Sequence, residues 1–176
     1  MPDYVKLPIG NDAPRRVNVV IEIPKDSLNK YEYDKHLQVF RLDRTLFSPV
    51  HYPGDYGFIP RTLSQDGDPL DALVLVEAPS FPGCLIEVRP IGVLRMTDQG
   101  KKDEKILAVA ESDPLYREIH DCAQVFPHQL REIEHFFSIY KNLEGKKTEM
   151  AGWDGADAAR QIIVEGQRRS GDLVIG

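Results

Sequence analysis

A chain of 176 residues with 41% hydrophobic and 28% charged residues has an ordinary globular composition and is long enough for one core. Its net charge of -6 disfavours a nucleic-acid partner, which normally meets a basic surface. No apolar run approaches the roughly 20 residues that cross a bilayer, and the first residues do not resemble a signal peptide, so we expect no membrane partner. Cys84 and Cys122 are isolated thiols, which favours a reducing, cytoplasmic location.

The first part of the chain is predicted to form short strands. Apolar and polar residues alternate over residues 17–23, which predicts a strand that Pro24 ends. Shorter strands are expected at residues 30–34 and 38–42. Residues 48–60 are rich in Pro, Gly and Tyr, and this number of breakers predicts an irregular, functional loop.

Strand signals continue in the middle of the chain. They follow the acidic segment 66–71 and cover residues 73–77, 85–96 and 106–110, with a hairpin turn at residues 98–100. Regular short strands of this kind predict a barrel or a sandwich.

The last third is predicted to be helical. Its first apolar positions recur at three- and four-residue steps, at Leu130, Ile133, Phe137 and Tyr140. This spacing predicts an amphipathic helix that begins near Pro127. A second helix is expected over residues 156–169, with Gly171 just beyond its end. Strands first and helices last describe an α+β chain, and without repeats or linkers we expect one domain over residues 1–176.

The segment Asp66-Gly67-Asp68-Pro69-Leu70-Asp71 places three carboxylates on one predicted turn. Like charges this close repel one another, and hard divalent cations with oxygen ligands relieve the repulsion, although a solvated acidic turn is the alternative. A calcium loop of the EF-hand type is excluded, because Leu70 and Asp71 stand where that loop needs a ligand and a Gly. An Asp-x-Asp metal-nucleotide site would use Asp66 and Asp68 but leaves Asp71 unexplained.

Two further charged groups lie on predicted strands and turns. Asp98 and Asp103 flank the predicted hairpin turn, and Lys105 shares a face with Asp103 if the strand is regular. Lys30 and Glu32 show the same spacing on an early strand. Each group by itself is also typical of a solvated surface.

Four aromatic and basic residues complete the candidate site. Tyr52 and Tyr56 lie in the breaker-rich segment, where their hydroxyls could meet phosphate oxygens or anchor the loop by packing. Tyr140 and Lys141 end the first predicted helix, where packing and a cation near the helix C-terminus explain them equally well. The five histidines show no metal-ligand spacing, and no GxGxxG, Walker A or GxSxG motif is present.

These motifs occur together in one order: Glu22-Ile23-Pro24, Lys30-x-Glu32, Asp43-Arg44, Tyr52-Pro53-x-x-Tyr56-Gly57, the acidic hexapeptide, Met96-Thr97-Asp98, Asp103-x-Lys105 and Phe136-Phe137-x-x-Tyr140-Lys141. As a set they resemble the soluble family I inorganic pyrophosphatases from about residue 16 to residue 169. The compact length is similar to the prokaryotic branch. The resemblance implies a homohexamer and an α+β, mainly β fold, in which a five-stranded OB-like β-barrel is flanked by two long C-terminal helices.

The resemblance also implies an activity and a set of roles. The reaction would be hydrolysis of pyrophosphate to two orthophosphates, with several Mg²⁺ ions and a hydroxide that bridges two metals as the nucleophile. Asp68 would be the general base. The implied metal ligands are Asp66, Asp71, Asp98 and Asp103, with Glu22 and Glu32 acting on metals through water. The implied phosphate-binding residues, of which Lys30, Arg44 and Tyr56 also count as catalytic, are Lys30, Arg44, Tyr56, Lys105, Tyr140 and Lys141.

Two other functions remain as alternatives. A metal-dependent transferase of a nucleotide diphosphate would need a pocket for a base or sugar, and no segment supplies one. A non-enzymatic OB-like binding module would need aromatic stacking positions in a basic groove, whereas carboxylates dominate the charged motifs here.

Overall fold

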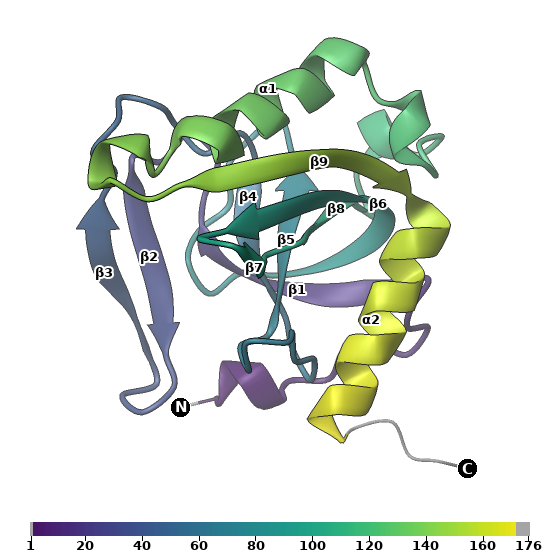
Figure 1. Ribbon diagram of the computed structural model, residues 1–176. Coiled ribbons are helices and arrows are strands. Elements are labelled where there is room, and N and C mark those ends of the chain that lie inside the picture. Colours follow the sequence, from purple (N-terminus) through teal and green to yellow (C-terminus); the bar gives the residue numbers. More distant parts are fainter. Residues whose placement is uncertain (1, 172–176) are drawn as a thin grey trace.

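Five strands of the main sheet close into a ring in the computed structural model, which describes residues 2–171 (Figure 1). In ring order the strands are β1 (Val17–Ile23), β4 (Asp55–Ile59), β5 (Leu70–Leu75), β8 (Lys105–Ala110) and β6 (Leu85–Asp98). The ring closes because β1 pairs antiparallel with both β4 and β6. Only β5 and β8 run parallel in this ring. The predicted mainly β fold with five closed strands and two C-terminal helices is confirmed.

Further strands extend or flank the ring. β7 (Lys101–Lys102) and β9 (Thr148–Gly155) both pair with β6, while β2 (Asn29–Asp34) and β3 (Val39–Thr45) form a separate hairpin beside the ring (Figure 1). The short 3-10 helices are η1 (Tyr4–Lys6), η2 (Pro114–Tyr116), η3 (Cys122–Gln124) and η4 (Asn142–Glu144).

The two helices cover two different apolar clusters. α1 (Pro127–Ile139) buries Ile133, Phe136 and Phe137 in one cluster, and α2 (Ala156–Ser170) buries Ile162 and Ile163 against the strand residues of the other. Neighbouring strand residues alternate between these clusters, as side chains on a pleated strand must. Leu73, for example, packs toward α1, and its neighbours in β5 pack toward α2. Both predicted helices are confirmed, and within residues 2–171 no helix is both long and apolar enough to span a membrane.

The prediction of an irregular loop over residues 48–60 is wrong for its second half. Residues 55–59 form β4, and all five are buried. The breakers are tolerated because Gly57 lies against β1, where an added Cβ would be 1.8 Å from the carbonyl oxygen of Val20. Pairing with β1 and β5 therefore outweighs the local preference for a loop.

The prediction that strands come first and helices last is also wrong in one place. β9 lies between α1 and α2 and pairs with β6 over most of its length. Its sequence carries two glycines, and Gly152 adopts a φ of +90°, so no local strand signal is visible. β5 also begins at Leu70, earlier than predicted, because Leu70 already pairs with Ile59 of β4.

Candidate active site

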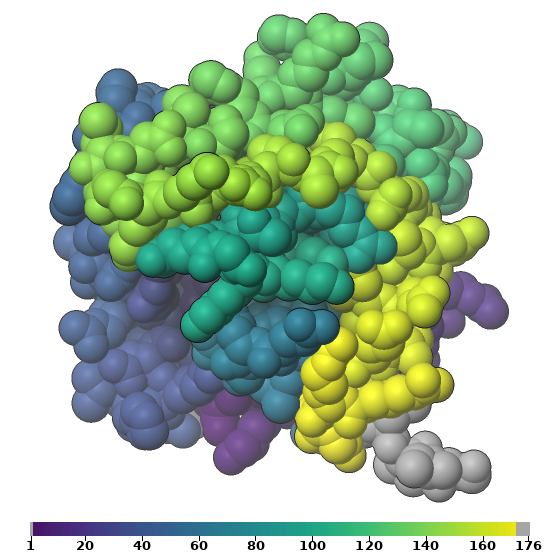
Figure 2. All heavy atoms as spheres, in the orientation of Figure 1, coloured from purple at the N-terminus to yellow at the C-terminus, as the bar shows by residue number. Residues whose placement is uncertain are grey.

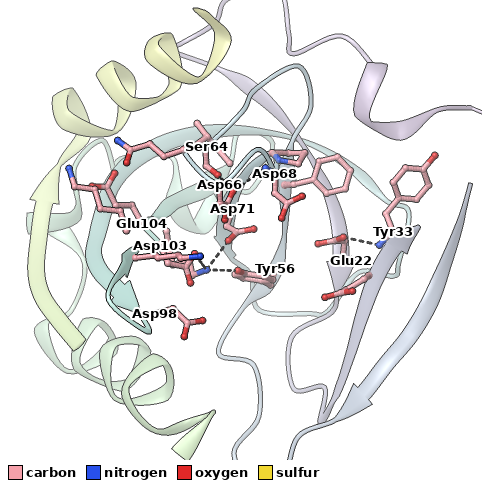
Figure 3. A pocket seen from close by; sticks show the side chains of 18 of the residues that line it. Glu22, Tyr33, Tyr56, Ser64, Asp66, Asp68, Asp71, Asp98, Asp103 and Glu104 are labelled. Carbon is pink, nitrogen blue, oxygen red and sulfur yellow. Dashed lines mark hydrogen bonds and ion pairs between the residues drawn. The ribbon is translucent and has the colours of Figure 1, made fainter. Parts of the chain in front are cut away.

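A pocket of about 700 Å³ opens between the acidic segment, the β2–β3 hairpin, the β6–β7 hairpin and the end of α1 (Figure 3). Carboxylates from separate elements turn toward it (Figure 3). All the predicted site residues except Arg44 line it: Glu22, Lys30, Glu32, Tyr56, Asp66, Asp68, Asp71, Asp98, Asp103, Lys105, Tyr140 and Lys141. Tertiary folding thus brings together residues that are separated by more than 100 positions in sequence.

Lys105 is the centre of the hydrogen-bonding network in this pocket. Its Nζ donates to Asp71 Oδ2 and to Asp103 Oδ1, each at 2.7 Å, and to the Tyr56 hydroxyl at 2.9 Å (Figure 3). The parallel pairing of β5 and β8 sets this geometry, because it places Asp71 opposite Lys105. Burial by itself would lower the pKa of Lys105, but Asp71 and the other nearby acidic groups hold that pKa well above its usual value. The ammonium therefore stays charged.

The acidic segment is held by hydrogen bonds within itself. Asp66 Oδ1 accepts from the Asp68 backbone N at 3.0 Å and from the Ser64 hydroxyl, and the Ser64 backbone N donates to the Asp68 carbonyl at 2.7 Å. Gly67 supplies the φ of +89° that the turn needs. The Asp68 side chain is 74% exposed, and its Oδ1 lies 3.3 Å from Lys35 Nζ. The turn thus presents Asp68 to the open side of the pocket.

The prediction that one turn carries all three carboxylates is wrong for Asp71. Asp71 lies in β5 and pairs with Phe58 of β4. Pro69 ends the turn, and the strand ladder begins immediately after it at Leu70. Asp71 is consequently fixed by the sheet, whereas Asp66 and Asp68 are fixed by the turn.

The end of α1 supplies the opposite wall of the pocket. Lys141 Nζ pairs with Asp98 Oδ2 and lies 5.3 Å from the centre of the Tyr140 ring. Tyr140 is 5% exposed and stacks on Phe136, with ring centres 5.2 Å apart. Burial raises the pKa of the Tyr140 hydroxyl, and burial likewise raises that of Tyr56, so both phenols stay protonated.

The third wall comes from β1 and β2. Glu22 Oε1 accepts a hydrogen bond from the Tyr33 backbone N at 2.9 Å (Figure 3). Burial, together with the charges of Asp71 and Glu32, raises the pKa of Glu22 to about 8 despite that hydrogen bond. Lys30 pairs with Glu32 on the same strand and with Asp43 at 3.2 Å. A carboxyl with a pKa of about 8 is mostly protonated at pH 7, and a cation bound beside it would favour its charged form.

The donor set fits hard divalent cations. Every candidate ligand offers carboxylate oxygens, and Asp98 Oδ1 is buried without a hydrogen-bond partner among the described residues. Burial raises the pKa of Asp103 even beside Lys105, and the charge of Asp71 acts in the same direction. Within residues 2–171, however, no three acidic, His or Cys side chains are already gathered around one metal position. Lys105 and Lys141 pair with the carboxylates instead.

Arg44 and Tyr52 are the two residues considered for phosphate contact that do not line the pocket. Arg44 lies outside the pocket lining and forms ion pairs with Asp43 at 2.5 Å and with Glu144 at 2.7 Å. Tyr52 is 1% exposed and packs with its ring centre 4.8 Å from that of Phe136. Of the two roles considered for Tyr52, the structure therefore favours the packing anchor.

Several lining residues were missed by the sequence reasoning: Lys35, Arg95, Lys101, Lys102, Glu104, Glu165 and Arg169. Lys101 and Lys102 had a visible signal, since they stand between Asp98 and Asp103. Lys35 sits in the β2–β3 turn and Arg169 near the end of α2, and neither adjoins a recognised motif. Only the folded chain brings these two residues to the pocket.

A ring of five strands with a pocket of carboxylates and lysines defines an α+β protein whose site suits cations and phosphates. The sequence model of the family described as inorganic pyrophosphatase matches residues 19–170. The chain belongs to the inorganic pyrophosphatase family.

Individual relatives agree with this assignment. The chain is 57% identical over 152 residues to an inorganic pyrophosphatase of Methanosarcina acetivorans, covering 86% of this chain and 90% of that protein. It is 52% identical over 161 residues to an inorganic pyrophosphatase of Nostoc sp., covering 92% and 95%. The crystal structure of the inorganic pyrophosphatase from Thermus thermophilus superimposes with a TM-score of 0.94 at 43% identity, covering 97% of this chain and 99% of that one.

Proposed function

We propose that the protein is an inorganic diphosphatase that hydrolyses pyrophosphate to two orthophosphates. The observation that carries this proposal is the convergence of Asp71, Asp103 and Tyr56 on Lys105 within one acidic pocket. The family membership gives the same reaction independently. The relatives named above are all inorganic pyrophosphatases, so the alternative of a nucleotide-diphosphate transferase has no support.

Mg²⁺ is the proposed cofactor, with several ions in one site. Asp66, Asp71, Asp98 and Asp103 would hold the ions, and Glu22 and Glu32 would act through water. The fit rests on the oxygen-only donor set and on Asp98 Oδ1, which has no hydrogen-bond partner within residues 2–171. Bound divalent cations neutralise phosphate charge and lower the pKa of an attacking water.

The chain's own residues have complementary tasks. Lys30, Lys105 and Lys141 would give up their carboxylate partners in part and donate to phosphate oxygens. Tyr56 and Tyr140 remain hydroxyl donors because burial raises their pKa. Arg44 would have to leave Glu144 to reach the substrate, which makes its proposed role conditional on a side-chain movement.

Asp68 is the proposed general base. The attacking water forms a new P–O bond, the bridging P–O bond breaks, and Asp68 accepts the proton that the water loses. Its position supports this role, since the turn fixes its backbone while its carboxylate remains exposed to the pocket. The leaving phosphate keeps the electron pair of the broken bond, and the nearby lysines stabilise that charge.

The domain organisation, the assembly and the cellular location of the protein are further proposals. We propose one domain over residues 1–176, a homohexamer and a cytoplasmic location. Both cysteines are free thiols, which supports a reducing compartment. Phe126, Leu143 and Leu115 are 82%, 67% and 65% exposed, which supports burial against other subunits. Light scattering after size-exclusion chromatography would measure the assembly.

Phosphate release from pyrophosphate tests the reaction directly. The wild-type protein should release phosphate with excess Mg²⁺, stop in EDTA, and act weakly on a nucleoside triphosphate. Asp68→Asn should lower turnover by several orders of magnitude while Mg²⁺ still raises the melting temperature. Asp12→Asn is the matched control, because Asp12 is a half-buried Asp outside the pocket that pairs with Arg16. Near-normal turnover of Asp68→Asn at raised pH would contradict the base assignment.

A further inference from the structure

The positive charges of the pocket differ in how they are partnered. Six lining cations lie within 4.0 Å of a carboxylate: Lys30, Lys35, Arg95, Lys105, Lys141 and Arg169. Lys101 and Lys102 also line the pocket, and neither has a carboxylate partner in the part of the chain that the structure describes. An incoming anion can meet these two ammonium groups without displacing an existing ion pair.

The β6–β7 hairpin fixes where these two lysines stand. In the backbone register of the hairpin, Lys101 lies opposite Asp98 and Lys102 lies opposite Thr97. The turn between β6 and β7 consists of Gln99 and Gly100, whose φ angles are +51° and +79°, as a tight hairpin turn requires. The backbone N of Gln99 also donates to the Lys147 carbonyl at 2.9 Å, which ties the turn to the segment before β9.

The position of the hairpin matters because both its lysines are exposed. In Figure 2 the teal hairpin stands out from the surface between the blue β2–β3 region and the yellow α2. Both β7 residues are exposed, whereas Lys105, a few residues further along the chain, is 4% exposed. The hairpin thus places positive charge at the solvent-exposed edge of the pocket, whereas Lys105 places it at the buried centre.

We propose that Lys101 and Lys102 are a capture site that draws the polyanionic substrate toward the pocket before Lys105 and Lys141 bind it. This inference rests on the proposed function and adds two residues to it. The chain has a net charge of -6 and nine carboxylates line the pocket, so an approaching phosphate is repelled wherever bound cations and paired side chains leave that negative charge uncompensated. Charges of one sign at a cleft raise the association rate of an oppositely charged substrate by about 10-fold or more.

The double variant Lys101→Gln/Lys102→Gln tests this proposal. Its matched control is Lys6→Gln/Arg131→Gln, which removes the same charge at two exposed positions outside the pocket. At low ionic strength we expect kcat/KM for pyrophosphate to fall about 5- to 10-fold in the hairpin variant, with kcat within about twofold of wild type. The control should stay within about twofold in both.

Salt dependence and binding give independent readouts. Screening shortens the Debye length from about 10 Å at 0.1 M salt to about 3 Å at 1 M, so the deficit should vanish at high salt. The dissociation constant of a non-hydrolysable diphosphonate with Mg²⁺, measured by calorimetry, should rise by a similar factor at low salt. Melting temperatures should match the wild type, since both side chains are exposed.

The outcomes separate this inference from the proposed function. If the wild type releases no phosphate from pyrophosphate, the proposed function fails, and the diphosphonate titration still decides whether the lysines attract a polyanion. If the wild type is active but the hairpin variant equals the control at low salt, the capture site is refuted. A deficit that persists at high salt, or that falls on kcat alone, would also refute it, because a contact at the reacting centre is not screened in this way.

Discussion

Replacing Gly57 with Ala should lower the free energy of unfolding more than any substitution at an exposed position. Gly57 lies in β4 opposite Ile21 of β1 and next to Tyr56 of the pocket. An added Cβ would lie 1.8 Å from the Val20 carbonyl oxygen and 2.9 Å from the Ile21 Cα. Both neighbours are backbone atoms of a strand that is fully buried at these positions, so the methyl group can be accommodated only by separating β1 from β4.

The magnitude follows from the size of that clash. Overpacking typically costs about 1–3 kcal/mol when side chains can shift, and a fixed backbone raises the cost to about 4 kcal/mol or more. For a chain of this length each kcal/mol lowers the melting temperature by about 2–4 °C, so we expect a fall of at least about 8 °C. Because the shift would also displace Tyr56, kcat/KM for pyrophosphate should fall.

Gly145→Ala is the matched control for this substitution. Gly145 has a φ of +73° but open space around its Cβ position, so the substitution adds backbone strain without a clash. That strain costs about 1 kcal/mol, or about 2–4 °C. Thermal unfolding followed by circular dichroism measures both variants. A melting temperature for Gly57→Ala within 2 °C of the wild type would refute the steric reasoning about the β1–β4 contact.

Three further predictions concern stability, charge and hydroxyl groups. Asp121 accepts hydrogen bonds from the backbone N of Ala123 and of Ala156, and these lower the pKa of Asp121, so Asp121→Ala should cost about 1–2 kcal/mol in urea unfolding at pH 7. A carboxyl whose folded pKa is lowered stabilises the protein above its unfolded pKa of 3.8; the deficit should therefore shrink as the pH falls below that value and should be absent at the lowest pH. Lys105→Met leaves Asp71 and Asp103 without their ammonium, so turnover should fall by at least about 100-fold. Mg²⁺ should raise the melting temperature of Lys105→Met more than that of the wild type, and an equal rise would contradict cation binding at these carboxylates. Tyr52→Phe should leave kcat and KM within about twofold of wild type, because Tyr52 lies in the core outside the pocket. A large loss of activity in a phosphate-release assay would contradict this prediction and would indicate that the Tyr52 hydroxyl contacts the substrate.

Local sequence patterns predicted those elements whose stabilising features lie within one short segment of the chain. The alternation over residues 17–23 is β1, and the apolar spacing after Pro127 is α1. Both patterns reflect one buried face, which repeats every second or every three to four residues. The order of the charged motifs led to the right family, because those side chains are chosen by chemistry and not by packing.

Patterns that depend on distant partners were missed. β4 and β9 contain glycines, which are typical of loops, yet each strand is held by pairing with a neighbouring strand. The position of Arg44 also depends on a distant partner, because its ion pair with Glu144, 100 residues further along the chain, holds it outside the lining; its contact with phosphate stays a prediction. No local signal announces such a partner.

What the sequence determined by itself was therefore the chemistry: the acidic segment, the paired carboxylates and lysines, and the family to which they belong. What only the tertiary structure decided was the arrangement of these groups. Lys105 joins Asp71, Asp103 and Tyr56, and the β6–β7 hairpin presents at the same pocket two lysines that have no carboxylate partner among residues 2–171. The physical reason is that each side chain's chemistry is given by its own residue, whereas the distances between side chains depend on strand register and ring closure. Register and closure are set by contacts between distant parts of the chain.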